Sequence, residues 1–384
     1  MKSSFQKRTL ALQDRIGEQG MDLALLTDPD TIYYVSGFCN YIGMEFGRPT
    51  MIILPRAKPG TLITPDAEME MARTMTWIED IRGWMDGVNG EWALHLRDLL
   101  GPFKKLTIGV ERSKITPVML ESFQSAVPAA SFVDVSDIVS EMRMIKSPEE
   151  IKAMRQAGEV AIAMCEAGVN TIGEGVPEYE VALAVIAGGT RKAAEFHSPE
   201  GAERLFSPMI HNLQILQSGH DTTMAHSRPT VRKIQKGDPV FMCFCCIASF
   251  KHFKLGFDRE YFVGSVKDEY ARIYEIAIGA QEAALKTIRP GVAAEEVHKA
   301  ACEVYRENGL GLDYRTGRGI GYSYLEEPQL KNGDKTLLER GMTFAVDGAV
   351  TIPGQFGARV GDSIVVTENG YEFLTPYPKD LRIL

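Results

Sequence analysis

The sequence predicts two domains, an α/β domain at the N-terminal end and a larger α+β domain after it. The chain has 384 residues, which suits two domains of about 100–200 residues each. Helical and strand-like patterns alternate in the first part, as is typical of an α/β domain. In the second part, runs of helices and runs of strands replace that alternation, and this favours an α+β domain.

In the first part, apolar residues at helical spacing predict a helix over residues 5–20. Apolar, β-branched or aromatic runs predict the strands that follow, at residues 22–27, 33–35, 50–54, 106–111 and 131–135. These strands should form a largely parallel or mixed sheet covered by helices.

The domain boundary is expected where a well-capped helix begins. Ser147 suits the N-cap, Pro148 suits the first helical position, and Glu150 completes a capping box. We therefore expect domains over residues 1–146 and 147–384.

The second part is expected to contain long helices and later strands. The predicted helices cover residues 148–167, 178–195, 267–287 and 294–308. The predicted strands cover residues 239–250, 257–264, 342–350, 358–366 and 372–375.

Charge and cysteine content exclude several classes of protein. The chain has 42 Lys and Arg against 51 Asp and Glu, a net charge of −9. An acidic chain without a basic run is a poor binder of nucleic acid or anionic membranes, so we expect neither partner. The polar N-terminus and the lack of long apolar stretches predict neither a signal peptide nor a transmembrane helix. Six sparse cysteines without a CxxC pair favour a soluble protein in a reducing cytoplasm.

Several polar residues stand where the surrounding pattern does not require them. His226 lies in an expected loop before a strand, a common place for a site, although a solvated histidine is the simpler reading. Asp347 interrupts an apolar strand, where an unpaired carboxylate is costly, so it needs a partner or a function. Asp258 belongs to a charged triplet with Arg259 and Glu260, which either covers an exposed face or points into a cleft.

Two further segments are ambiguous. Cys243, Cys245 and Cys246 predict either a buried, thiol-lined strand or a reactive thiol, with no metal-ligand spacing nearby. The glycines at residues 317–321 suit a loop that passes close to a ligand, because no Walker lysine follows them.

Taken in order, these segments resemble the "pita-bread" superfamily of methionine aminopeptidase, prolidase, aminopeptidase P and creatinase. The motifs on which this resemblance rests are the His226 segment, the paired strands after it, the glycines at 317–321 before Glu326-Glu327-Pro328, and the segment 362–370. The resemblance covers the chain from about residue 148, and the first part is similar to the smaller domain of prolidase and creatinase. It implies an α+β pita-bread domain preceded by a smaller α/β domain.

The metallopeptidases of that superfamily use five metal ligands, two Asp, one His and two Glu. The resemblance places these ligands on Cys243, Gly256, Arg318, Asp347 and Gly361. One carboxylate remains, and a guanidinium at a ligand position would repel a metal. The resemblance therefore implies no bound metal, no other cofactor and no aminopeptidase activity.

Creatinase, a metal-free member, is the most similar in its motifs. Glu45-Phe46-Gly47-Arg48-Pro49 matches a creatinase segment whose Phe and Arg reach the partner subunit's site and hold the substrate carboxylate. The resemblance thus implies a homodimer in which Phe46 and Arg48 bind substrate. Arg318 departs from the family pattern and could neutralise Asp347, bind a second anionic group or stabilise a developing oxyanion. Arg318 and Tyr324 are further candidate substrate-binding residues.

The catalytic residues of creatinase fall on His226, Asp258 and Asp347. Both aspartates are glutamates there, so each carboxylate here is one methylene shorter and the substrate need not be creatine. A neutral histidine can take a proton from water and return it to a leaving nitrogen. Two carboxylates can hold a cationic amidine or amine.

The expected function is metal-independent hydrolysis of a C–N bond in a small, carboxylate-bearing, zwitterionic substrate, creatine-like or ectoine-like. One alternative is a lyase or decarboxylase on the same scaffold. Another is a non-enzymatic binding protein with a degenerate peptidase fold.

Overall fold

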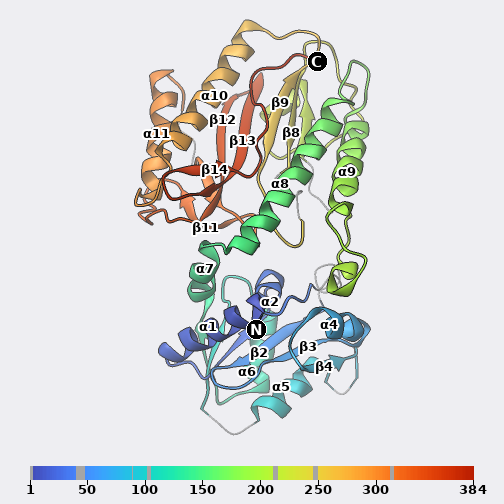
Figure 1. The fold of residues 1–384 in the computed structure, drawn as a ribbon, viewed down its shortest axis with the longest axis vertical. Coiled ribbons are helices and arrows are strands. Elements are labelled where there is room, and N and C mark those ends of the chain that lie inside the picture. The colour runs from blue at the N-terminus through green and yellow to red at the C-terminus, as the bar shows by residue number, and fades with distance from the viewer. Residues whose placement is uncertain are drawn as a thin grey trace. The chain divides into compact units, whose positions relative to one another are not determined.

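The computed structural model describes residues 3–39, 48–88, 90–101, 105–210, 215–244, 250–311 and 315–384. The chain separates into two compact units (Figure 1). One unit comprises Met1–Met142 with Pro199–Leu205, and the other comprises Arg143–Ser198 with Phe206–Leu384. Both units combine helices with a sheet, which confirms the predicted fold class. The boundary expected after residue 146 stays a prediction.

The N-terminal unit is built on a mixed sheet with strand order β4-β3-β2-β1-β5-β6. β1 pairs in parallel with β5 and antiparallel with β2. The strands are β1 (Leu23–Leu26), β2 (Met51–Pro55), β3 (Thr61–Pro65), β4 (Asp80–Trp84), β5 (Thr107–Val110) and β6 (Ser131–Asp134). The helices are α1 (Ser4–Glu18), α2 (Pro29–Ser36), α4 (Met69–Met75), α5 (Trp92–Leu100), α6 (Pro117–Ala126) and α7 (Ser136–Met144).

The strand predicted at residues 33–35 is wrong, because this segment lies within α2. Asp28 caps the helix by accepting a hydrogen bond from the backbone of Thr31, and Pro29 occupies the first turn. An Asp-Pro pair is a helix start signal. Here it overrides the β-propensity of Tyr33 and Val35.

The C-terminal unit is built on an antiparallel sheet with strand order β11-β10-β12-β13-β9-β8-β7, and β14 pairs with β13. The strands are β7 (Ile215–Ser218), β8 (Pro239–Cys243), β9 (Asp258–Phe262), β10 (Gly317–Gly319), β11 (Glu326–Leu330), β12 (Thr343–Ile352), β13 (Phe356–Val366) and β14 (Tyr371–Phe373). The helices are α8 (Pro148–Val169), α9 (Glu178–Ala194), α10 (Asp268–Thr287) and α11 (Ala294–Glu307). Short 3-10 turns η2 (Gly201–Leu205) and η3 (Gly219–Thr223) precede and follow β7.

The capping box predicted for α8 is present. The Ser147 side chain accepts the Glu150 N–H at 3.3 Å, and the Glu150 carboxylate accepts the Ser147 N–H at 2.6 Å. Two N–H groups at the helix end are thereby satisfied, which fixes the start of α8.

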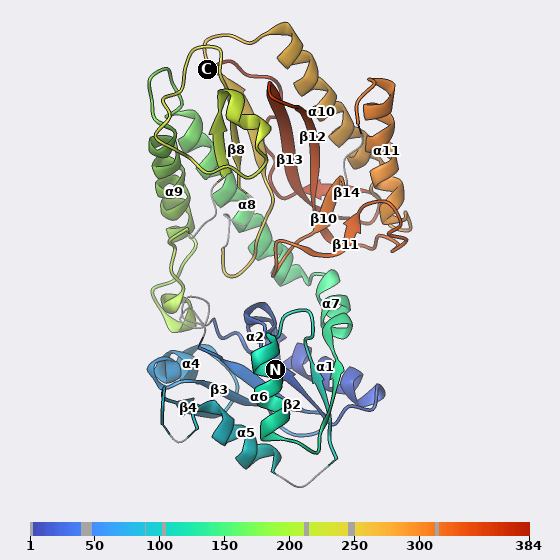
Figure 2. The same cartoon turned by 180° about the vertical axis from the view of Figure 1, so that it is seen from behind.

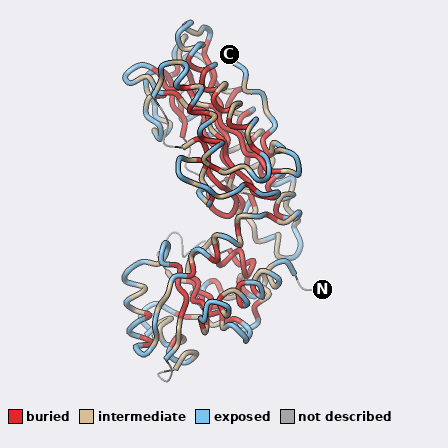
Figure 3. The backbone as a smooth tube through the Cα atoms, turned by 90° about the vertical axis from the view of Figure 1, so that its left-hand side faces the viewer, coloured by how far each residue is buried: buried red, intermediate tan, exposed pale blue. Residues whose placement is uncertain are grey.

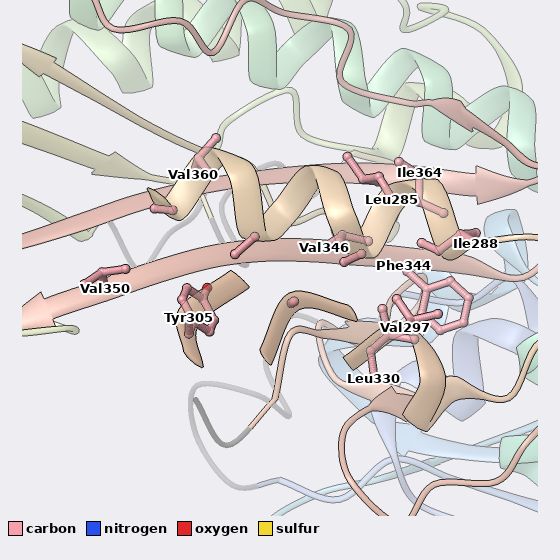
Figure 4. Packing of buried hydrophobic residues seen from close by; sticks show 14 of the residues in the cluster. Leu285, Ile288, Val297, Tyr305, Leu330, Phe344, Val346, Val350, Val360 and Ile364 are labelled. Carbon is pink, nitrogen blue, oxygen red and sulfur yellow. The ribbon is translucent and has the colours of Figure 1, made fainter. Parts of the chain in front are cut away.

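Helices α10 and α11 cover one face of this sheet, where they enclose the apolar core of the unit (Figure 4). Leu285 of α10 and Ile288, the residue after this helix, pack with Phe344 and Val346 of β12. Burying one such aliphatic side chain contributes about 1.5–3 kcal/mol. The face that remains is turned toward the viewer in Figure 2, with α8 and α10 behind the strands.

The burial pattern follows the sheets. Figure 3 shows the buried positions concentrated in the interior of each unit, with exposed positions around them. In β8 and β9 every residue is buried, so both faces of these strands are covered by side chains or backbone. Among the described residues, no helix is long and apolar enough to cross a membrane.

Candidate functional site

A row of residues crosses the middle of the C-terminal sheet. Cys243 of β8 pairs with Asp258 of β9, Asp258 pairs with Gly361 of β13, and Gly361 pairs with Asp347 of β12. Directly paired residues direct their side chains to the same face of a sheet. These four positions therefore share one face, which we call the site face.

The site face is the one turned away from the helices. Gly348, next to Asp347, packs so closely on α10 that an added Cβ would lie 2.0 Å from the Ala277 carbonyl oxygen. Tyr261 of β9 contacts the Cys165 thiol of α8 at 3.2 Å. Because side chains alternate along a strand, Asp258 and Asp347 point to the opposite side.

The two aspartates face a common point above Gly361. A Cβ atom added to Gly361 would lie 2.6 Å from Asp347 Oδ1 and 3.1 Å from Asp258 Oδ2. The Asp347 Oδ1 atom is buried and has no hydrogen-bond partner among the described residues. Asp258 is only 6% exposed. Glycine at position 361 thus allows one oxygen of each carboxylate to approach its backbone closely.

Arg318 lies beside this space on β10. Its Nη1 atom is 2.9 Å from Asp347 Oδ2, and its Nε donates to the Tyr324 carbonyl oxygen at 2.8 Å. The guanidinium is nearly buried, whereas the Asp347 side chain is 26% exposed. The segment expected as a glycine-rich loop therefore contains a short strand that fixes Arg318 on the site face.

Gly256 makes room for Arg318. A Cβ atom at Gly256 would lie 3.0 Å from Arg318 Nη2 and 2.6 Å from the Ala345 Cβ. Neither Gly256 nor Gly361 has a positive φ, so space rather than backbone conformation accounts for both glycines.

Arg259 holds the site from the helix-covered face. Its Nη1 donates to the carbonyl oxygens of Asp258 and Gly361 at 2.7 and 2.9 Å, and its Nη2 is 2.7 Å from Asp362 Oδ1. Burial raises the pKa of Asp362, and the Arg259 guanidinium opposes this rise. Arg259 thus positions the backbone of two site residues. Sequence reasoning missed it, because a surface charge was the simpler reading.

Glu260 is a further buried carboxyl group on the site face, two residues after Asp258. Its Oε2 accepts the Arg359 N–H at 3.1 Å, and its Oε1 has no hydrogen-bond partner among the described residues. Burial raises the pKa of Glu260 to about 8, against the backbone hydrogen bond and positive charge of Arg359. The charged triplet at 258–260 is therefore buried on both faces of β9.

His226 is not hydrogen-bonded to these residues in the described structure. Its side chain is exposed, and the segment that carries it follows η3. Gln217 of β7 donates to the carbonyl oxygens of Met224 and Ser227 at 2.5 and 3.1 Å. Gln217 pairs with Phe241, which shares the site face with Cys243, so the His226 segment is anchored on that face.

The remaining predicted site residues are placed as follows. Arg48 forms an ion pair with Asp86 inside the N-terminal unit, and both side chains are about half exposed. Tyr324 exposes its side chain and uses its backbone oxygen to bind Arg318. Phe46 lies outside the described residues, as do Cys245 and Cys246.

A buried ion cluster fixes the segment between Arg318 and β11. Glu326 accepts Arg143 at 2.6 Å, Lys146 at 2.8 Å and the Ser323 N–H at 2.9 Å. Burial alone would raise the pKa of Glu326, but the Lys146 and Arg143 charges outweigh it and lower the pKa to about 2. The cluster ties the residues after Arg318 to the segment before α8.

The five positions to which the resemblance assigns metal ligands do lie on this part of the fold, but their donor set does not fit a dinuclear metal. They offer a thiol, two glycines, a guanidinium and the single carboxylate of Asp347, one oxygen of which binds Arg318. In the described part of the chain, no group of three or more His, Cys, Asp or Glu side chains is placed to hold a metal ion.

The chain belongs to metallopeptidase family M24, whose model matches residues 152–368, and the creatinase/prolidase N-terminal domain matches residues 8–145. It is 30% identical to the agropine synthesis cyclase of Rhizobium rhizogenes, over 97% of this chain and 96% of that protein. It is 28% identical to a creatinase from a Bacillus species, over 98% and 92% of the two chains. A prolidase structure from Thermococcus sibiricus superimposes with a TM-score of 0.87 at 26% identity and covers both chains fully. The predicted family and its pita-bread fold are thereby confirmed, and the chain shares its scaffold with hydrolases and related enzymes.

Proposed function

We propose that this chain is a metal-independent hydrolase that cleaves a C–N bond in a small, carboxylate-bearing, zwitterionic substrate. One observation carries the proposal: Asp258 and Asp347 present one oxygen each to a common point above Gly361. Two carboxylates in this arrangement, Asp258 buried and Asp347 partly buried, are suited to bind a cationic nitrogen group through charge-assisted hydrogen bonds.

The donor set supports metal independence. A guanidinium has no lone pair to offer a metal, and its positive charge at this distance from Asp347 disfavours a dication. Arg318 supplies a fixed positive charge instead, which can neutralise Asp347 or stabilise negative charge that develops on the substrate.

His226 is the proposed general base and acid. Its neutral imidazole takes a proton from water, and the water oxygen attacks the carbon of the C–N bond. The bond then breaks, and His226 returns the proton to the leaving nitrogen. His226 lies on a segment anchored to the site face, and such catalytic contacts commonly tighten only when substrate binds.

Arg48 is the proposed ligand of the substrate carboxylate, donated by the partner subunit of a cytoplasmic homodimer, and Phe46 is proposed as a second substrate-binding residue. Its exposed ion pair with Asp86 contributes little, so Arg48 can exchange that partner for a substrate carboxylate. Bidentate binding by a guanidinium suits a planar carboxylate. Tyr324, exposed next to the Arg318 segment, is proposed to contact the substrate.

Turnover in excess chelator tests the proposal. We would screen creatine, ectoine, and N-acyl and N-amidino amino acids by mass spectrometry, in 18O-labelled water. The expected result is turnover that chelator leaves unchanged and a product that carries one solvent oxygen. Activity that chelator abolishes and added metal restores would contradict the proposal.

The similarity to agropine synthesis cyclase favours a second candidate, an intramolecular cyclisation on the same site. The same labelling distinguishes the two reactions. Hydrolysis adds one water, whose oxygen is 18O, to the products, whereas cyclisation or elimination incorporates no solvent oxygen.

A further inference from the structure

We infer that Gln217 is a positioning residue, which holds the turn that carries His226 in place on the site face. The inference deepens the proposed function, on which it rests for the role of His226 as base and acid. It explains how a histidine on an exposed segment keeps a fixed place beside the site.

His226 lies in a tight turn over residues 224–227. The Ser227 N–H donates to the Met224 carbonyl oxygen at 3.3 Å, which closes a four-residue turn with His226 at its third position. Residues 224–226 are exposed. One closing hydrogen bond in an exposed turn contributes little, so the turn needs a further contact to stay in one conformation.

Gln217 of β7 supplies this contact. Its Nε2 donates to the Met224 carbonyl oxygen at 2.5 Å and to the Ser227 carbonyl oxygen at 3.1 Å. These are the first and last residues of the turn, so one side chain binds the backbone on both sides of His226. A primary amide suits this task, because one nitrogen offers two N–H donors without a charge, and Gln217 is only 1% exposed.

The strand register relates Gln217 to the carboxylates of the site. Gln217 pairs with Phe241 of β8, and Phe241 pairs with Glu260 of β9. Glu260 lies two residues after Asp258, so the row that contains Gln217 runs about 7 Å from the row of Asp258 along the strands. A turn that is fixed on Gln217 is therefore fixed relative to Asp258 as well.

The segment before the turn is fixed separately, on β13. Thr222 of η3 is fully buried, its carbonyl oxygen accepts Arg359 Nη1 at 3.1 Å, and its Oγ1 accepts the Gly357 N–H at 3.2 Å. These contacts hold η3 without Gln217. Loss of the Gln217 amide should therefore release only the turn that carries His226.

The second polar atom of the amide argues for a role beyond stability. Gln217 Oε1 is buried and has no hydrogen-bond partner among the described residues. A buried acceptor without a partner costs free energy, so stability alone does not favour an amide over an apolar side chain at this position. The two N–H bonds to the turn account for the amide.

Gln217→Met tests the inference, because methionine has a similar length and no N–H donor. The matched control is Gln13→Met in the N-terminal unit. Gln13 is also buried, and its Nε2 donates to the carbonyl oxygens of Pro55 and Lys58 at 2.5 and 2.7 Å. Both variants lose a pair of hydrogen bonds of the same kind, but only Gln217→Met releases the His226 turn.

We would measure hydrogen–deuterium exchange of the full-length protein by mass spectrometry, on peptides that contain the Ser227 N–H. Gln217→Met should speed exchange of this turn about tenfold or more, whereas Gln13→Met should leave it unchanged. Exchange within η3 should stay at the wild-type rate in both variants. Unchanged exchange of the turn in Gln217→Met would overturn the inference.

Turnover distinguishes positioning of His226 from a purely structural role. We would use whichever of creatine, ectoine, and the N-acyl and N-amidino amino acids is turned over in chelator. Gln217→Met should lower kcat about 10- to 100-fold and change KM little, because misplacement of the base acts on the transition state. Gln13→Met should change neither. Faster exchange of the turn with unchanged kcat would also overturn the inference.

Two further outcomes keep the test decisive. If Gln217→Met does not fold, Gln217→Asn replaces it, because an amide one methylene shorter cannot reach both carbonyl oxygens, and the same results are expected. If none of the compounds is turned over, the proposed hydrolysis is contradicted, and exchange of the turn alone then decides the role given to Gln217.

Discussion

Arg318 is nearly buried and forms an ion pair with Asp347, a partly exposed residue of a neighbouring strand, with 2.9 Å between Nη1 and Oδ2. A hydrogen bond to a charged group contributes about 1.5–3 kcal/mol. Arg318→Met should therefore lower the free energy of unfolding by about that amount, measured by urea denaturation. The matched control is Arg155→Met, whose ion pair with Glu372 is about half exposed and should contribute less than about 1 kcal/mol. Equal effects of the two substitutions would contradict the role given to Arg318.

Arg48 and His226 should complement each other between subunits. Arg48→Ala and His226→Ala should each lose activity, because one removes a carboxylate ligand and the other the base. If Arg48 acts in the partner's site, mixed dimers of the two variants contain one intact site. Random mixing should then recover about a quarter of wild-type activity, as expected for a symmetric dimer with shared sites. If the subunits exchange and the mixture still recovers no activity, Arg48 does not act across the interface.

Glu260 should make the C-terminal unit less stable at alkaline pH. Burial raises its pKa from 4.5 to about 8 in the folded state. The folded state therefore binds the proton more tightly, and this contribution is complete below pH 4.5 and is lost as pH rises through 8. Glu260→Gln should flatten the fall in unfolding free energy over this range.

Glu111 of the N-terminal unit provides a control for the pH dependence expected from Glu260. Burial, together with the charge of Asp28, raises its pKa to about 7. Glu111→Gln should flatten the pH dependence of its own unit and leave that of the C-terminal unit unchanged. A Glu260→Gln protein with the wild-type pH profile would contradict a buried, protonated Glu260.

Glu326 should make the C-terminal unit less stable at acid pH, the opposite of the effect expected for Glu260. Its pKa falls from 4.5 to about 2, because the Lys146 and Arg143 charges outweigh burial. The stabilisation is present above pH 4.5 and is lost as pH falls through 2. Glu326→Gln should lower stability at neutral pH by about 3–5 kcal/mol and weaken the acid dependence. Glu372→Gln, at an exposed pair, should change stability by less than about 1 kcal/mol.

Local signals explain what the sequence could predict. The start of α8 depends on Ser147 and Glu150, three residues apart, and both hydrogen bonds of their capping box form. The α2 segment carries an equally local signal in Asp28 and Pro29, and this cap outweighs the β-propensity of Tyr33 that predicts a strand.

Distant partners explain what the sequence could not predict. Arg259 reads as a surface charge until Asp362, 103 residues further on, is brought against it. The geometry of the site could not be predicted for the same reason, because Asp258, Asp347 and Gly361 become neighbours only through the register of three strands. Identifying Asp258 and Asp347 from the resemblance was possible, but their convergence above Gly361 was not visible in the sequence.

The close fit of Gly256 and Arg318 constrains the order in which this site can evolve. Any side chain at position 256 meets Arg318 Nη2 at 3.0 Å and the Ala345 Cβ at 2.6 Å. An aspartate at position 256 would clash while the arginine remains, and loss of the arginine alone would leave Asp347 without its cation. A substitution at either position alone should therefore give a less stable protein. Positions 256 and 318 are thus expected to tolerate change only together.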